Sequence, residues 1–167
     1  MRKLAISTFV LIILLSSFLS FSVPKVNATP LAWQFLAPMQ TARVNHTATL
    51  LSDGRVLVTG GQDAEGAYLK SAQIYDPFNG KWTDAAEMNY SRVGHSAVLL
   101  PDGRVFVAGG KGLREIGNAA QLQNAEIYDP LTDTWQLLSA TMQSPRQYHT
   151  ATLLQDGRVL LVGGQFN

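Results

Sequence analysis

The stretch RVNHTATLLSDGRVLVTGG, from Arg43 to Gly61, decides the fold of this chain. It returns twice within the 167 residues, as RVGHSAVLLPDGRVFVAGG and as RQYHTATLLQDGRVLLVGG. In each copy a β-rich run precedes an Asp-Gly pair, an apolar run follows it, and two glycines end the motif. Asp-Gly between two such runs indicates a β-hairpin, because glycine accepts the positive φ of a tight turn. We therefore expect a repeat protein with three hairpins, over residues 43–61, 92–110 and 146–164.

The segments between the hairpins repeat as well, although less closely. A phrase that runs from Trp to Arg precedes each hairpin, beginning at Trp33, Trp82 and Trp135. A polar loop follows each of the first two glycine pairs, over residues 62–71 and 111–124. These loops lead to the runs AQIY and AEIY, which Asp-Pro ends because Asp bonds to the backbone of a turn and Pro fixes φ. One unit therefore has four short strands and a period of about 50 residues, without helical periodicity.

The double glycine, the Tyr-Asp-Pro and the Trp at these offsets resemble kelch repeats of the galactose oxidase/kelch β-propeller class. The resemblance covers residues 29–167 and implies an all-β ring of four-stranded blades. The His-Thr-Ala-Thr strand would be innermost and the Trp strand outermost. We count one outer strand from Trp33, two blades and half of a third, which makes about eleven strands in about two and a half blades.

Propellers close with about four to eight blades, because closure removes exposed sheet faces and edges. Two and a half blades cannot close such a ring. We therefore expect an incomplete segment, either the N-terminal part of a longer propeller or a truncated gene product. Closure between copies of the chain is the alternative.

Residues 1–28 have the pattern of a secretory signal peptide. A positively charged start precedes an uncharged apolar run from Leu4 to Val23, and Ala28 offers a small residue at the cleavage position. We expect cleavage after Ala28, a secreted product and only transient contact with a membrane. The short signal suits a bacterium as well as other sources. The alternative is an uncleaved anchor, because about 20 apolar residues can span a bilayer.

Charge and composition exclude several classes of function. Three of the 13 basic residues lie in the predicted signal peptide, so ten would remain against 12 acidic ones, a net charge of −2. Such a surface, without basic runs, argues against nucleic acid as a partner. We find no Gly-rich phosphate loop and no nucleophile elbow, and we predict no catalytic residues and no cofactor. Galactose oxidase needs copper and a Cys–Tyr crosslink, and a chain without Cys does not support that chemistry.

Three histidines, His46, His95 and His149, occupy one repeat position. Imidazoles on neighbouring inner strands could in principle ligate zinc or copper. Repetition favours a structural role instead, in which each His fixes its own blade through backbone hydrogen bonds. We therefore predict no metal site.

Three arginines, Arg43, Arg92 and Arg146, lie in the connections from outer to inner strand. In a structural interpretation they make salt bridges or carbonyl contacts between blades. In a functional one they form a ring of guanidinium groups that faces an anion near the mouth of the propeller. We keep them as candidate ligand-binding residues. A second set follows the Asp-Gly turns on the opposite face and is expected to face solvent: Arg55, Arg104 and Arg158.

The loops after the glycine pairs vary where the rest of the unit repeats. Loops on a rigid scaffold are where recognition usually occurs, so we expect any binding site there. The candidate residues are Gln62, Asp63, Glu65 and Tyr68 from the first loop, with Lys111, Arg114, Glu115 and Asn118 from the second.

The sequence therefore predicts an exported, non-catalytic module that binds protein or carbohydrate, with self-association through open blade faces as a further expectation. The alternative is the N-terminal propeller of a larger secreted enzyme, galactose-oxidase-like or carbohydrate-active, whose catalytic residues lie outside this chain. Sequence beyond Asn167 would discriminate them, since further blades favour the first function and an added catalytic domain the second.

Overall fold

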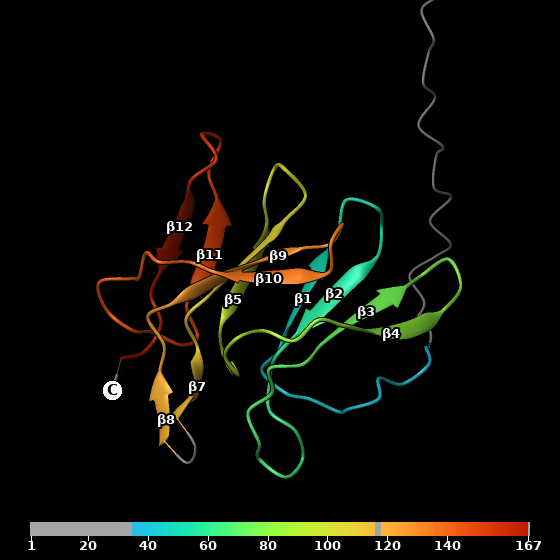
Figure 1. Ribbon diagram of the computed structural model, residues 1–167, viewed down its shortest axis with the longest axis horizontal. Coiled ribbons are helices and arrows are strands. Elements are labelled where there is room, and N and C mark those ends of the chain that lie inside the picture. The colour runs from blue at the N-terminus through green and yellow to red at the C-terminus, as the bar shows by residue number, and fades with distance from the viewer. Residues whose placement is uncertain (1–34, 116–117, 167) are drawn as a thin grey trace, which may run out of the picture. The chain divides into compact units, whose positions relative to one another are not determined.

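The computed structural model describes residues 35–115 and 118–166, so the predicted signal peptide and its cleavage site lie outside the described residues. The segment Phe35–Asn167 forms one compact unit. Its described residues contain twelve β-strands and no helix (Figure 1). Within this described part, accordingly, no helix is long and apolar enough to cross a membrane.

Two four-stranded antiparallel sheets form the blades of a kelch-type propeller. Blade 1 pairs its strands in chain order, and blade 2 does the same except that a separate hairpin interrupts it. Blade 1 consists of β1 (Thr47–Leu50), β2 (Val56–Thr59), β3 (Ala72–Asp76) and β4 (Lys81–Ala85). Blade 2 consists of β5 (Ser96–Leu99), β6 (Val105–Ala108), β9 (Ala125–Asp129) and β10 (Thr134–Leu137).

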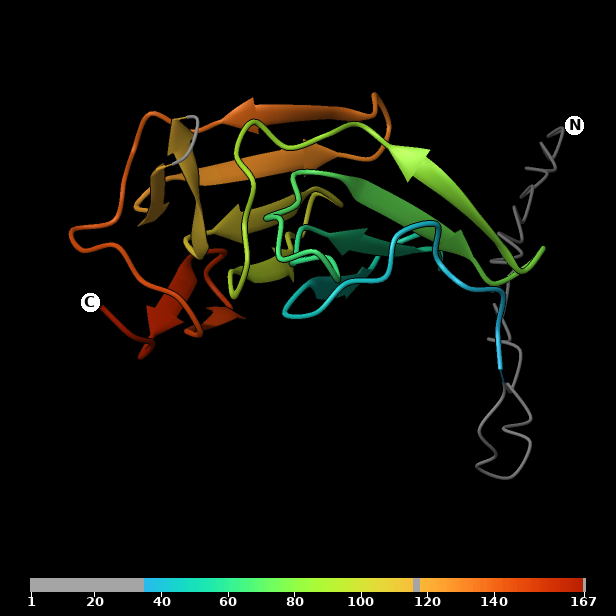
Figure 2. The same ribbon diagram turned by 90° about the horizontal axis from the view of Figure 1, so that it is seen from below.

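The third repeat forms only a hairpin in the described residues, from β11 (Thr150–Leu153) and β12 (Val159–Val162). The strands that follow the histidines lie side by side, with β5 between β1 and β11 (Figure 2). The Trp strands β4 and β10 form the outer edges of their sheets. The predicted all-β propeller of about two and a half blades is therefore confirmed, with the predicted strands innermost and outermost.

Each Asp-Gly motif closes its hairpin with a three-residue loop. In the first copy the Gly54 amide donates to Leu51 O at 3.0 Å, and the Leu51 amide donates to Arg55 O at 2.8 Å. Gly54 has a φ of +90°, which a side chain would strain. The same pattern of bonds recurs in the other two copies, and this repeated geometry is why all three motifs form hairpins.

The segment 111–124 was expected to be a polar loop, and this expectation is wrong. It contains a two-stranded hairpin, β7 (Lys111–Glu115) and β8 (Asn118–Gln121). The base of this hairpin is fixed to the connection between the blades, because Val93 and Lys111 exchange backbone hydrogen bonds of 2.8 Å. At Gly112 the hairpin approaches the Ser91 carbonyl so closely that a Cβ could not fit.

The expected outer strand at the start of the chain is also not found in the described residues. Trp33 lies outside them, and residues 35–46 contain no strand; their isolated bridge joins Val44 to Gln62 in the loop after β2. The described part therefore has twelve strands rather than about eleven, because the extra hairpin adds two and the leading strand is missing.

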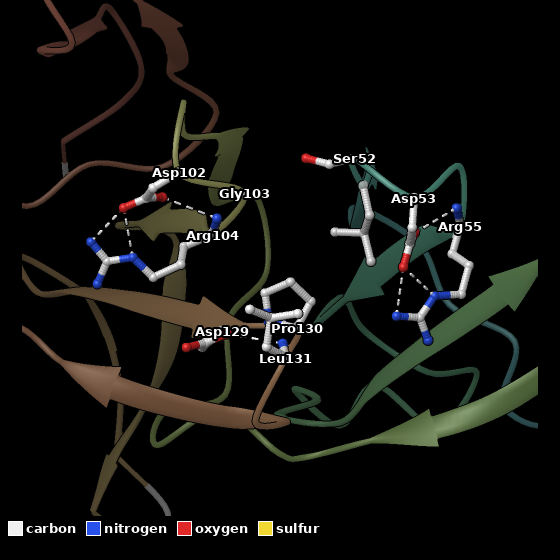
Figure 3. Close-up of a pocket in the computed structure, with 10 residues that line it drawn as sticks. Ser52, Asp53, Arg55, Asp102, Gly103, Arg104, Asp129, Pro130 and Leu131 are labelled. Carbon is white, nitrogen blue, oxygen red and sulfur yellow. Dashed lines mark hydrogen bonds and ion pairs between the residues drawn. The ribbon is translucent and has the colours of Figure 1, made fainter.

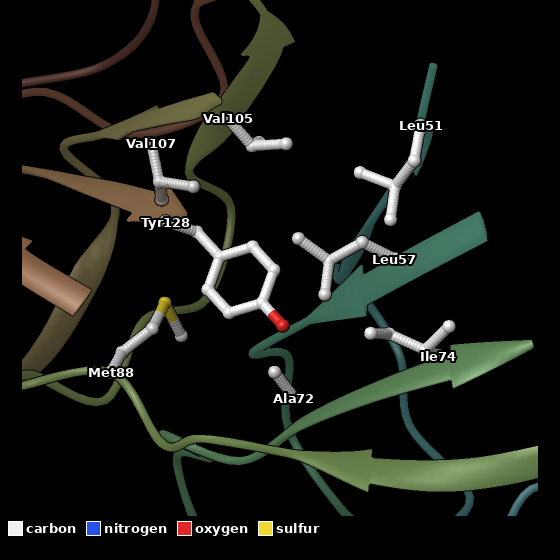
Figure 4. Packing of buried hydrophobic residues seen from close by; sticks show 8 residues of the cluster. All are labelled: Leu51, Leu57, Ala72, Ile74, Met88, Val105, Val107 and Tyr128. Carbon is white, nitrogen blue, oxygen red and sulfur yellow. The ribbon is translucent and has the colours of Figure 1, made fainter. Parts of the chain in front are cut away.

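The hydrophobic core lies between blades 1 and 2. Buried side chains of β2 and β3 face those of β6 and β9, and Met88 from the connecting segment closes the cluster (Figure 4). Leu57, Val105 and Val107 have no exposed surface. The phenol ring of Tyr128 also lies in this cluster. Because each sheet buries a face against its neighbour, the two blades stabilise each other.

Candidate functional site

The three arginines of the connections hold their own blades together. Each guanidinium donates through Nη1 to the carbonyl of the first glycine of the pair that ends its hairpin. These bonds measure 3.0 Å from Arg43, 2.9 Å from Arg92 and 3.0 Å from Arg146. Arg43 also donates to the Ser71 carbonyl at 3.1 Å. The geometry therefore favours the structural interpretation, with carbonyl contacts inside one blade rather than between blades.

Arg92 is removed from solvent and forms a buried ion pair with Glu126, whose side chain is also fully buried. Its Nη2 lies 2.8 Å from Glu126 Oε1. Burial lowers the pKa of Arg92, and the nearby Glu126 carboxylate opposes this shift. The proposed ring of anion-facing guanidinium groups therefore does not form here, because Arg92 has no exposed surface to offer an anion.

Glu126 also binds the backbone of the segment that connects the blades. Its Oε2 accepts hydrogen bonds of 2.7 Å from the amide and from the side chain of Asn89, and its Oε1 accepts one of 3.1 Å from the Tyr90 amide. One carboxylate thus fixes both the arginine and the connecting segment to blade 2. In blade 1 the same repeat position holds Gln73, whose Oε1 is buried without a hydrogen-bond partner in the described residues.

Two of the three histidines, His95 and His149, join neighbouring blades through side-chain hydroxyls. His95 Nε2 lies 2.9 Å from Thr47 Oγ1 and 3.1 Å from Thr59 Oγ1, both in blade 1. His149 Nε2 lies 2.8 Å from Ser96 Oγ in blade 2. The sequence predicted that each His fixes its own blade through backbone hydrogen bonds, whereas the partners of these two Nε2 atoms are hydroxyls of the preceding blade.

The environment of His95 favours its neutral form. Burial, together with the Arg92 charge and the other two histidines, lowers the pKa of His95 to about 3. Burial also lowers the pKa of His149. Among residues 35–115 and 118–166 there is no group of three His, Asp or Glu side chains that could hold a metal ion.

The first candidate loop follows Gly61 and forms a compact turn. Gln62 Nε2 donates to Gly66 O at 2.8 Å, and Asp63 Oδ1 accepts from the Ala67 amide at 2.7 Å. Glu65 is exposed, and Tyr68 is half-buried beside Gln62. Gln62, Asp63 and Arg43 line a small pocket of about 190 Å³, so the structure brings together three of the predicted residues there.

The second candidate loop is the β7–β8 hairpin. Lys111 is half-buried at its base, and Asn118 is exposed at the start of β8. Arg114 and Glu115 belong to β7, but their side chains lie outside what the structure describes. Both candidate loops extend from the same side of the blades, opposite the Asp-Gly turns (Figure 1). Whether they bind a ligand together stays a prediction.

A larger pocket, of about 320 Å³, lies on the opposite side, and it was not predicted from the sequence. It lies between the Asp-Gly turns of blades 1 and 2 and the Asp-Pro turn of blade 2 (Figure 3). Arg55 and Arg104 flank it, each half-exposed and paired at 2.7 Å with the Asp of its own turn. The hydrogen bond from Arg104 lowers the pKa of Asp102.

The one sequence signal for this pocket was an apolar residue in an otherwise polar turn. Leu131 lines the pocket and is 93% exposed. Phe78 occupies the same repeat position in blade 1 and is 85% exposed. From the sequence, any binding site was expected in the varied loops on the other side, and these two side chains were not considered.

Comparisons with known proteins place the chain among kelch-type propellers. It is 31% identical to alpha-scruin of Limulus polyphemus over 133 residues and 31% identical to beta-scruin of the same animal over 134 residues. Each match covers 79% of this chain but only 14% of the relative, so the chain spans about a seventh of their length. The family model described as Attractin/LZTR1 beta-propeller matches residues 19–167. The chain therefore belongs to the Attractin/LZTR1 β-propeller family.

Proposed function

We propose that this chain is an exported propeller module that binds or scaffolds other proteins and has no catalysis of its own. The observation that carries the proposal is the contrast between a repeated frame and two unlike loops on one side of it. The repeated arginine and histidine side chains and the glycine backbone make the hydrogen bonds that hold the blades together. The compact turn after Gly61 makes hydrogen bonds within itself, and the β7–β8 hairpin pairs its two strands with each other while its base is bonded to the frame. Recognition usually uses such loops on a rigid scaffold.

A protein partner suits this surface better than a small molecule. The pocket beside the first loop holds only about 190 Å³, whereas pockets for drug-sized ligands hold about 300–1,000 Å³. The β7–β8 hairpin projects beyond the blades (Figure 1) and adds polar, extended backbone to this side. Carbohydrate is the second ligand class expected from the sequence, and a glycan array with the purified chain tests it directly.

The test compares loop variants with matched controls outside the loops. Partners are first identified by proximity labelling. The affinity of each variant is then measured for each purified partner. Tyr68→Ala and Arg114→Ala should each weaken binding at least about tenfold, the loss of one interface anchor. The control for Arg114→Ala is Arg158→Ala, since Arg158 is exposed and lies at the distant Asp-Gly turn. If both loop variants bind as the unchanged protein does, the loops are not the binding surface.

Export rests on the sequence of residues 1–28 and has its own test. Mass spectrometry of protein recovered from culture medium should find a mature N-terminus at Thr29, because the cleavage position follows Ala28. A product that keeps Met1 and stays with the membrane fraction would contradict secretion and support an uncleaved anchor.

A further inference from the structure

The interface between consecutive blades is built from the same atoms each time. The amide of the second glycine donates to the carbonyl of the next connecting arginine, from Gly61 to Arg92 at 2.7 Å and from Gly110 to Arg146 at 2.8 Å. The first glycine leaves room for that carbonyl, since a Cβ on Gly60 would lie 2.5 Å from Arg92 O. The next histidine then bonds to a hydroxyl on the first residue of the preceding inner strand. A blade therefore has a donor face and an acceptor face.

The donor face of the third hairpin is uncovered in the described part of the chain. A Cβ on Gly163 would meet no atom within 4 Å, and the Gly164 amide has no hydrogen-bond acceptor there. Thr150 stands where Thr47 and Ser96 stand, yet no histidine reaches its hydroxyl. Leu160, at the repeat position of the fully buried Leu57, is 47% exposed.

The acceptor face of blade 1 is uncovered in the same way. His46 makes no hydrogen bond to any described residue, and its Nδ1 is buried without a partner. The carbonyl of Arg43 receives none of the described backbone hydrogen bonds. Leu50 is 63% exposed, although Leu99 at the same repeat position packs against the core. Each group missing from the third hairpin therefore has its counterpart on blade 1.

We propose that a second copy of this chain docks its blade 1 on the β11–β12 hairpin, head to tail, and so repeats the contact between blades. In this interface His46 of one copy bonds to Thr150 Oγ1 of the other, and the Gly164 amide donates to the Arg43 carbonyl. Leu160 and Leu50 become buried between the copies. Two different faces meet, so the interface is heterologous, and it extends to a closed ring or an open chain of copies. The proposal concerns assembly and stands apart from ligand binding by the loops.

The experiment measures the mass of the purified chain by sedimentation velocity over a range of concentrations. The unchanged protein should move from one chain toward two or more as its concentration rises. Leu160→Lys and Leu50→Lys should each weaken the association at least about tenfold, because each buries an unpaired charge. The matched control is Leu131→Lys, an equally apolar and more exposed site away from both faces. This control should associate like the unchanged protein.

A mixture of the two face variants distinguishes head-to-tail docking from other modes. The Leu160→Lys copy keeps an intact blade 1, and the Leu50→Lys copy keeps an intact hairpin. Mixed together, they should recover one interface and form a dimer that goes no further. If only one of the two variants dissociates, a face pairs with itself and the head-to-tail interface is wrong. A monomer at every concentration, as when further blades of a longer chain occupy these faces, also overturns the proposal.

A conservative pair tests the predicted hydrogen bond itself. Thr150→Val keeps the shape of the side chain, and with His46→Ala it should weaken association by about fivefold for one bond. The double variant should be no weaker than the more affected single variant, because both remove the same contact. Additive effects of the two substitutions would show that His46 and Thr150 do not meet. Circular dichroism confirms that each variant keeps the β fold.

Discussion

Glu126 receives five hydrogen bonds, from Asn89, Tyr90 and Arg92, at a position where its side chain has no exposed surface. Burying a carboxylate and a guanidinium costs solvation energy that such bonds offset only in good geometry. Gln73 stands at the same position in blade 1 and leaves a buried oxygen without a partner in the described residues. The repeat therefore tolerates an amide here, and in blade 1 the acidic side chain that acts on the arginine is Asp84, which accepts a hydrogen bond from Gln73.

Glu126→Gln should destabilise the protein by about 3 kcal/mol, because it leaves the buried Arg92 charge without a counterion. The measurement is the midpoint of urea unfolding. The dependence of the free energy of unfolding on urea concentration should stay unchanged. The control is Glu87→Gln, which removes the 2.6 Å ion pair with Lys70 that is more than half exposed. That exposed pair should account for less than about 1 kcal/mol. Equal losses for the two substitutions would contradict the role given to Glu126.

His95 should make the fold sensitive to acid. Its pKa is about 3 in the folded protein, where burial favours the neutral ring, and near 6.5 in the unfolded chain. The unfolded state therefore binds the proton more readily, so stability is full above pH 6.5 and falls as the pH drops toward 3. At pH 5 the loss should be about 2 kcal/mol. Urea unfolding measured between pH 7.5 and pH 5 should show this fall in the free energy of unfolding. His95→Gln should remove most of the pH dependence.

At the scale of elements, the hairpins followed directly from the sequence, because turn chemistry is local. Asp-Gly with an apolar run on each side was enough to place the hairpin loops correctly. The β7–β8 hairpin was missed because its stability depends on groups distant in sequence. One of them is the Ser91 hydroxyl, which accepts a hydrogen bond of 3.0 Å from the Leu113 amide. The partners of the histidines were missed for a related reason. Spacing showed that His95 recurs, but it could not show that the ring points at the preceding blade.

The glycine that ends each inner hairpin offers a matched pair of sites. Gly60 and Gly163 share a repeat position and a positive φ, of 62° and 73°. A Cβ would lie 2.5 Å from Arg92 O at Gly60 but would meet nothing within 4 Å at Gly163. Gly163→Ala should therefore cost only the backbone strain, about 1–2 kcal/mol. Gly60→Ala should cost about 1–3 kcal/mol more, because it also separates the blades. Thermal unfolding of the two variants, at a concentration where the chain is monomeric, measures the difference.

Over the whole molecule, stability should decrease from the contact between blades 1 and 2 toward the third hairpin. Blades 1 and 2 share one buried core, whereas β12 exposes about half of Leu160 and Val162. In repeat proteins each unit is stabilised mainly by the surface it buries against its neighbours, so the third hairpin, which buries less apolar surface than blades 1 and 2, should open more easily.

Hydrogen exchange can test this gradient and the docking of copies in one experiment. Amides of β2 and β6 should exchange only on global unfolding, while those of β11 and β12 should exchange at least about tenfold faster through local opening. The Gly164 amide, which has no acceptor among the described residues, should be unprotected in dilute protein. As concentration rises, its protection should increase together with that of β12, because a second copy supplies the acceptor and covers the strand. Protection that rises uniformly over the molecule would instead indicate association through another surface, and a Gly164 amide protected already in dilute protein would contradict its exposed position.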